Sequence, residues 1–239
     1  MGSDNPKSAS EKKRDILFHL EAYLAKRDGI DKLLKISRYA TKIIILSSSS
    51  SSSSSSPLIS RIKSFESSVG VSRKAFRLGK FVQDLNALRL TSSSKTLSRT
   101  DRGFTYLAYG GEGVYYFLEQ FVWVVKTGLI PKEYGSRVQK ISAWAELIGY
   151  VGSVALKISE VKRIKLDLDE EKEMEMVKGR RLREKLLMKQ MSIIQDFADA
   201  LMALGDVRDG KGAFTGPILM ASAGLLSAII STHKNWQSC

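Results

Sequence analysis

The sequence has 239 residues, 43% of them hydrophobic, which is enough for one large domain or two small ones. Its 38 Lys and Arg against 25 Asp and Glu give a formal net charge of +13, which favours a partner that carries phosphate, either nucleic acid or an anionic lipid surface. The single cysteine, Cys239, excludes a disulfide framework within one chain, and the apolar cluster Ile16 to Leu20 is too short for a secretory leader.

The first part of the chain predicts two helices. We expect residues 1–14 to be disordered and residues 15–46 to form N-terminal helices divided at the Asp28-Gly29 break. Apolar residues of the second helix recur at helical spacing and predict one buried stripe, made of Leu33, Leu34, Ile36, Tyr39, Ile43 and Ile44. The cations between them are expected to be solvated: Lys32, Lys35, Arg38 and Lys42. The serine run Ser47 to Ser56 lies in a predicted flexible loop, residues 47–57.

The next region, residues 58–90, is expected to be helical and to contain an amphipathic helix from Val71 to Leu90. At about 100° per residue its apolar side chains fall within one arc: Val71, Ala75, Leu78, Phe81, Val82, Leu85 and Leu88. Its basic residues are Arg73, Lys74, Arg77, Lys80 and Arg89, although Lys74 lies inside the apolar arc. Such a helix is either the core-facing helix of a bundle or a helix that lies in a membrane interface. The excess of cations favours the interface, with the cations on lipid phosphates.

The middle of the chain changes from apolar to charged. After a predicted linker, residues 91–103, the apolar helical region 104–159 holds a possible membrane span at Phe104 to Val125, where Glu112 and Glu119 would have to face protein or water. Gly110, Gly111 and Gly113 lack the context of a nucleotide loop and predict close helix packing or a kink. Residues 160–212 predict a solvated charged helix, and no nucleic-acid-binding motif accompanies its basic block, so we expect no nucleic-acid partner.

The C-terminal segment is the strongest predicted membrane span. Ala213 to Thr232 contains no charged residue in 20 positions, about the length that crosses a bilayer core, and a short tail, residues 233–239, follows. Its small residues, among them Gly224, would allow another helix to approach closely. The alternative is a buried helix that begins late, at Gly216 and Pro217, and is too short to span. We predict an all-α, membrane-associated protein with an interfacial amphipathic helix and one or two membrane-spanning helices.

Catalysis is not expected. The only histidines, His19 and His233, lie at opposite ends of the sequence, and no phosphate-cradling loop or cluster of metal ligands is present. We therefore expect no catalytic residue, no cofactor and no metal.

Four stretches together resemble the peroxin-11 (peroxisomal biogenesis factor 11) family, in its plant members. They are RDGIDKLLKISRYATK at Arg27 to Lys42, SRKAFRLGKFVQDLNALR at Ser72 to Arg89, GEGVYYFLEQFVWVVKTGL at Gly111 to Leu129, and AGLLSAIISTHKNW at Ala223 to Trp236. The serine run departs from the family pattern as an apparent insertion, and the C-terminus lacks the dilysine signal of some members.

The resemblance implies a multi-pass protein of the peroxisomal membrane with cytosolic termini. It implies that the chain elongates and tubulates peroxisomes before fission, with Ser72 to Arg89 inserted into one leaflet of an anionic membrane. It also implies self-association with copies and relatives, and recruitment of a tail-anchored fission adaptor and a dynamin-related GTPase. The alternative is a channel for small metabolites, in which Glu112, Glu119 and Lys126 line a polar path between helices.

Overall fold

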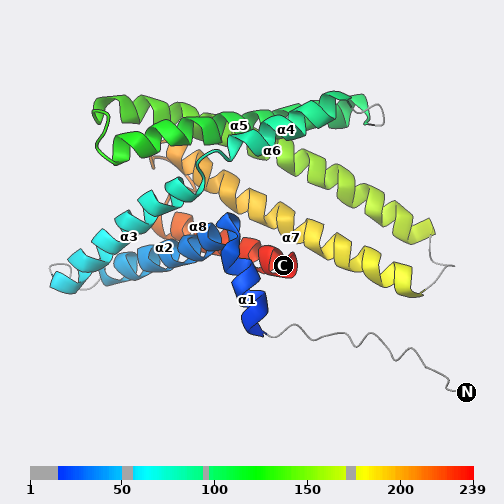
Figure 1. Cartoon of the computed structure of the whole chain (residues 1–239), viewed down its shortest axis with the longest axis horizontal. Helices are drawn as coiled ribbons and strands as arrows, with labels where there is room; N and C mark the ends of the chain where they lie inside the picture. Colours follow the sequence, from blue (N-terminus) through cyan, green and yellow to red (C-terminus); the bar gives the residue numbers. More distant parts are fainter. Residues whose placement is uncertain (1–15, 50–55, 94–96, 171–175) are drawn as a thin grey trace, which may run out of the picture.

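The computed structural model describes residues 16–49, 56–93, 97–170 and 176–239, all of whose regular elements are helices (Figure 1). The predicted all-α class is confirmed. The predicted disordered N-terminus and most of the serine run lie outside the described residues. The helices are α1 (Ile16–Ala25), α2 (Arg27–Ser49), α3 (Pro57–Phe76), α4 (Phe81–Ser93), α5 (Arg99–Lys126), α6 (Glu133–Glu170), α7 (Met176–Val207) and α8 (Pro217–Gln237).

The helices pack as a chain of neighbours rather than around one central element. In Figure 1, α2 and α3 form a hairpin at the lower left, while α4 and α5 run along the top. Helix α6 packs between α5 and α7, and α8 packs between α7 and α2. This order leaves an interior space between the α2–α3 hairpin and α5, α6 and α7.

Small residues bring α5 and α6 into close contact. A Cβ atom placed on Gly152 would lie 2.4 Å from the backbone nitrogen of Ala108, and one on Gly111 would lie 2.5 Å from that of Gly149. Any side chain at these positions would push the helices apart. The predicted close packing at the glycine cluster is therefore confirmed at Gly111, whereas Gly110 faces open space.

The prediction of one unbroken helix from Val71 to Leu90 is wrong. Helix α3 ends at Phe76, residues 77–80 form a turn, and α4 begins at Phe81. Gly79 adopts a positive φ of 74°, which costs other residues roughly 1–2 kcal/mol but not glycine. We call residues 77–80 the α3–α4 joint.

The predicted C-terminal span begins later than expected. Gly216 is the N-cap of α8 and Pro217 its first residue, so residues 213–215 are not helical, and Phe214 has a positive φ of 64°. The small face of α8 is buried, and Gly224 fits against the ring of Tyr39 on α2, as the predicted close approach requires. Within the part of the chain that the structure describes, Glu133–Leu168 is the one helix that is long and apolar enough, by length and composition, to cross a membrane, and the predicted span Ala213–Thr232 does not meet this criterion.

Candidate functional site

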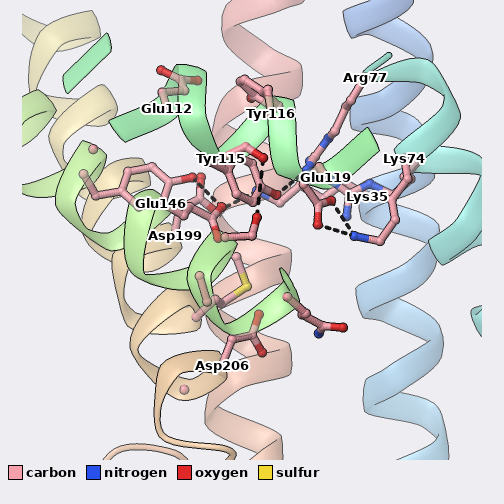
Figure 2. Close-up of a pocket in the computed structure, with 18 of the residues that line it drawn as sticks. Lys35, Lys74, Arg77, Glu112, Tyr115, Tyr116, Glu119, Glu146, Asp199 and Asp206 are labelled. Carbon is pink, nitrogen blue, oxygen red and sulfur yellow. Dashed lines mark hydrogen bonds and ion pairs between the residues drawn. The ribbon is translucent and has the colours of Figure 1, made fainter. Parts of the chain in front are cut away.

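The most prominent feature of the interior is a polar cavity of about 650 Å³ between the α2–α3 hairpin and helices α5, α6 and α7 (Figure 2). Its lining is strongly ionic, and the charges are segregated. The α2–α3 side, with the joint, contributes only cations among its charged lining residues: Lys32, Lys35, Arg38, Lys42, Arg73, Lys74, Arg77 and Lys80. The opposite side contributes Lys126 and Lys157 together with seven acids: Glu112, Glu119, Glu146, Asp196, Asp199, Asp206 and Asp209.

Buried ion pairs connect the two sides. Lys35 Nζ donates to Asp199 Oδ1 on α7 at 2.7 Å and to Ser227 Oγ on α8 at 2.6 Å, and Lys35 is only 4% exposed. Burial would raise the pKa of the Asp199 carboxyl, but the nearby charge of Lys35 outweighs it and lowers that pKa below its ordinary value. The charged pair therefore holds α2 against α7 and α8.

A second connection joins α3 to α5. Lys74 Nζ donates to the carboxylate of Glu119, as Figure 2 shows. This contact explains why Lys74 interrupts the apolar arc of the sequence pattern, since its side chain reaches a buried acid instead of solvent.

Asp31 on α2 gathers three cations in one place. Its carboxylate accepts from Arg73 Nε at 3.0 Å and lies 3.3 Å from Arg77 Nη2 and 3.6 Å from Lys32 Nζ. Burial would raise the pKa of Asp31, but the two guanidiniums and Lys32 outweigh it and hold the pKa far below its ordinary value. Arg77 Nη1 also donates to Tyr115 Oη at 2.9 Å, whereas the buried Nη2 of Arg73 has no hydrogen-bond partner among the described atoms.

Four of the five predicted lipid-binding cations thus have carboxylate partners inside the chain. Asp31 pairs with Arg73 and Arg77, and Glu119 pairs with Lys74. Lys80 lies 3.4 Å from Asp28 and 4.8 Å from the ring centre of Tyr116. Arg89, at the far end of α4, is exposed. Their binding of lipid phosphate stays a prediction.

The predicted apolar face is divided by the joint. Val82 and Leu85 on α4 are exposed, while Phe81 packs edge-on against Phe117 of α5. The other members are partly buried: Val71, Ala75, Leu78 and Leu88. Their insertion into a bilayer likewise stays a prediction.

The polarity predicted for α2 is wrong in part, although Tyr39 of the predicted buried stripe does pack against Gly224 of α8. Lys32 and Lys35, predicted to be solvated, line the cavity, and Leu33 and Ile44 of the predicted buried stripe are exposed. The helical period was correct, but the interior that the helix faces is ionic rather than apolar. Asp31, Lys35 and Asp199 are the central residues that sequence reasoning missed, and the regular spacing of cations along α2 was their only local signal.

Helix α6 also turns polar side chains toward the cavity and apolar side chains outward. Polar residues at helical spacing line the cavity, among them Ser142, Glu146 and Ser153. Its exposed apolar side chains form a stripe on the outside: Ile141, Trp144, Ile148, Val151 and Ile158. Glu112, Glu119 and Lys126 also line the cavity, and their predicted role in a polar path for metabolites stays a prediction.

Comparison with known proteins decides the family. The profile described as Peroxisomal biogenesis factor 11 (PEX11) matches residues 17–236. The chain belongs to this family. It is 54% identical to Peroxisomal membrane protein 11A of Arabidopsis thaliana, over 98% of this chain and 97% of that protein. It is 56% identical to Peroxisomal membrane protein 11-3 of Oryza sativa subsp. japonica, over 95% of this chain and 91% of the relative.

The similarity extends beyond plants at a lower level. Peroxisomal membrane protein PMP30B of Candida boidinii is 25% identical over 66% of this chain and 64% of its own length. No solved structure matches the chain. As a family member the chain is a peroxisomal membrane protein of peroxisome biogenesis.

Proposed function

We propose that this chain is a non-enzymatic protein that elongates and tubulates the peroxisomal membrane before fission. The observation that carries the proposal is the reversed polarity of α6, with an exposed apolar stripe outside and polar residues on the cavity. A helix with exposed Ile141, Trp144 and Ile148 is stable in contact with acyl chains and costly in water.

In this proposal the segment Ser72 to Arg89 is the part that deforms the anionic lipid membrane. Val82 and Leu85 project from α4 with 47% and 55% exposure, so they are free to enter one leaflet. Insertion into a single leaflet expands it relative to the other and favours curvature. The basic residues of the segment would then bind lipid phosphates.

The chain ends support a common side of the membrane for both termini, which we propose is the cytosolic side. His19 Nε2 lies 2.8 Å from the backbone oxygen of Trp236, and Lys26 Nζ donates to that of Ser238 at 2.8 Å. Self-association, binding of family relatives, and recruitment of a tail-anchored adaptor and a dynamin-related GTPase belong to the same proposal.

The test replaces an exposed apolar side chain of α4 by a charged one. Cells that lack the protein receive the full chain carrying Leu85→Asp, and peroxisome length is measured by fluorescence microscopy. We expect elongation to fall several-fold because a charge at Leu85 opposes entry into the leaflet. Gln83→Asp adds the same charge at an exposed polar position of α4 and should preserve elongation. Normal elongation with Leu85→Asp would contradict the proposal.

The cavity favours a second function, a channel for small metabolites. Glu112, Glu119 and Lys126 lie on an ionic cavity inside helices whose outer side chains are apolar. Single-channel recording on the purified chain tests this function, with Glu112→Gln and Lys126→Gln compared with the wild type. Unchanged conductance and ion selectivity in both variants would refute the assignment of the cavity as a pore.

A further inference from the structure

The α3–α4 joint conflicts with the sequence around it. The apolar positions from Val71 to Leu90 keep the period of one straight helix, but the chain bends at Gly79, whose φ of 74° no helix contains. A Cβ atom on Gly79 would have nothing within 4 Å, so no neighbouring side chain or backbone requires a glycine there. The bend depends on the backbone freedom of this one residue.

Just before this bend, cations at the end of α3 lie against carboxylates of the chain. Arg73 and Arg77 are four residues apart, and in a straight helix they would lie on one face. In the structure both hold the Asp31 carboxylate, at 3.0 and 3.3 Å, and neighbouring Lys74 holds Glu119. A carboxylate offers guanidiniums a pair of anionic oxygens, and a phosphate also offers them such a pair.

From these observations we propose that the α3–α4 joint is a hinge with a masked phosphate site. In the bent conformation Asp31 fills the site formed by Arg73 and Arg77, and in the straight conformation a lipid phosphate replaces it. This inference rests on the proposed membrane insertion of the segment, and it adds the control of that insertion.

The balance between the two conformations has identifiable contributions. Asp31 and Glu119 favour the bent form because leaving Arg73, Arg77 and Lys74 unpaired in the interior is costly. A residue other than glycine at position 79 would oppose the bend and favour the straight helix. Anionic lipid favours the straight form, because its phosphates replace both carboxylates at once.

The experiment measures insertion of α4 in the full chain. Cys239→Ser removes the only cysteine, and Leu85→Cys then accepts an environment-sensitive fluorophore at an exposed position. The labelled chain is reconstituted in vesicles of neutral lipid with increasing anionic phospholipid, and the blue shift of emission reports the inserted fraction.

Two variants open the hinge by independent routes, and each has a matched control. Gly79→Ala should raise the ratio of inserted to bent chains by about tenfold, whereas Gly103→Ala, a methyl added to a helical glycine that also faces open space, should not. Asp31→Asn should raise the same ratio and should lower the anionic lipid needed for half insertion. Asp28 is the half-exposed partner of Lys80, and Asp28→Asn should raise the ratio of inserted to bent chains less than Asp31→Asn does.

The outcomes separate the hinge from the function on which it rests. Wild-type insertion that rises with anionic lipid, but stays unchanged in Gly79→Ala and Asp31→Asn, would overturn the hinge and preserve the proposed function. No insertion of any chain at any lipid composition would overturn both. If Asp31→Asn fails to fold, Gly79→Ala still decides, because it removes no contact in the bent form.

Discussion

The contact between α5 and α6 and the contacts of the α2–α3 hairpin with α5 and α7 are stabilised by different forces. Along α5 and α6, Gly111, Gly149 and Gly152 bring the two backbones together with no room for a side chain. The α2–α3 hairpin instead meets α5 and α7 through ion pairs such as Lys35–Asp199 and Lys74–Glu119. Close packing has one arrangement, whereas a cation can exchange one anion for another. The α5–α6 pair is therefore suited to a fixed scaffold, and the ion-paired face of the hairpin is suited to exchanging partners.

The largest expected effect comes from breaking the buried pair that anchors the hairpin. Asp199→Asn leaves Lys35 charged and 96% buried without a carboxylate, which should cost about 3–5 kcal/mol of unfolding free energy. Denaturant unfolding of the purified chain in detergent measures the loss.

Two further variants test whether burial is the cause. Asp209→Asn breaks the exposed Lys140–Asp209 pair and should cost at most about 1 kcal/mol. Replacing both partners, Lys35→Met with Asp199→Leu, should recover most of the loss, because no buried charge remains unpaired. Equal losses in Asp199→Asn and Asp209→Asn would show that the buried pair does not anchor the hairpin.

The next effect in size concerns the scaffold. Gly152→Ala would place a methyl group 2.4 Å from the backbone nitrogen of Ala108, and the resulting separation of α5 and α6 should cost about 1–3 kcal/mol. Thermal unfolding in detergent should show a lower midpoint.

Gly110→Ala is the control for helix propensity. It adds the same methyl on α5 where nothing lies within 4 Å, and it should stabilise the helix by up to about 1 kcal/mol. If both variants shift the midpoint in the same direction, the close approach of the two backbones is not what stabilises the scaffold.

The same two regions show what sequence can predict. Helical periods correctly placed most helices, and the glycine cluster correctly indicated close packing at Gly111. The period does not say whether the face that turns inward is apolar, so the cations of α2 were expected in solvent although they line the cavity. Gly216 and Pro217 do signal the late start of α8, whereas the absence of charge in residues 213–232 predicts a longer helix.

The candidate site was harder to predict than the fold. Lys35 and Asp199 are 164 positions apart in sequence, and nothing local to either residue identifies the other. Glu112 and Glu119 could be expected to face the interior because acidic residues in an apolar stretch must avoid lipid, and both line the cavity. The joint at Gly79 was missed because a lone glycine inside a helical pattern is compatible with an unbroken helix.

The smallest expected effect is a pH dependence where α4 meets the scaffold. Asp84 on α4 is buried, and its Oδ2 atom has no hydrogen-bond partner among the residues that the structure describes. Burial together with the charge of Glu112 raises its pKa to about 7 against the opposing effect of Lys80. Because the folded pKa lies above the unfolded one, stability should be greatest below the unfolded pKa and should fall as pH rises toward 7.

Asp84→Asn tests this dependence directly, since the amide does not ionise. The unfolding midpoint of the wild type should decrease between about pH 5 and about pH 8, and the variant should lose much of this decrease and be the more stable chain at the higher pH. Asp209→Asn, which removes an exposed carboxylate, should leave the wild-type dependence in place. If the wild type, Asp84→Asn and Asp209→Asn respond equally to pH, the charge on Asp84 does not weaken the packing of α4 on α5. The contacts at the α3–α4 joint alone would then control the separation of α4 from α5.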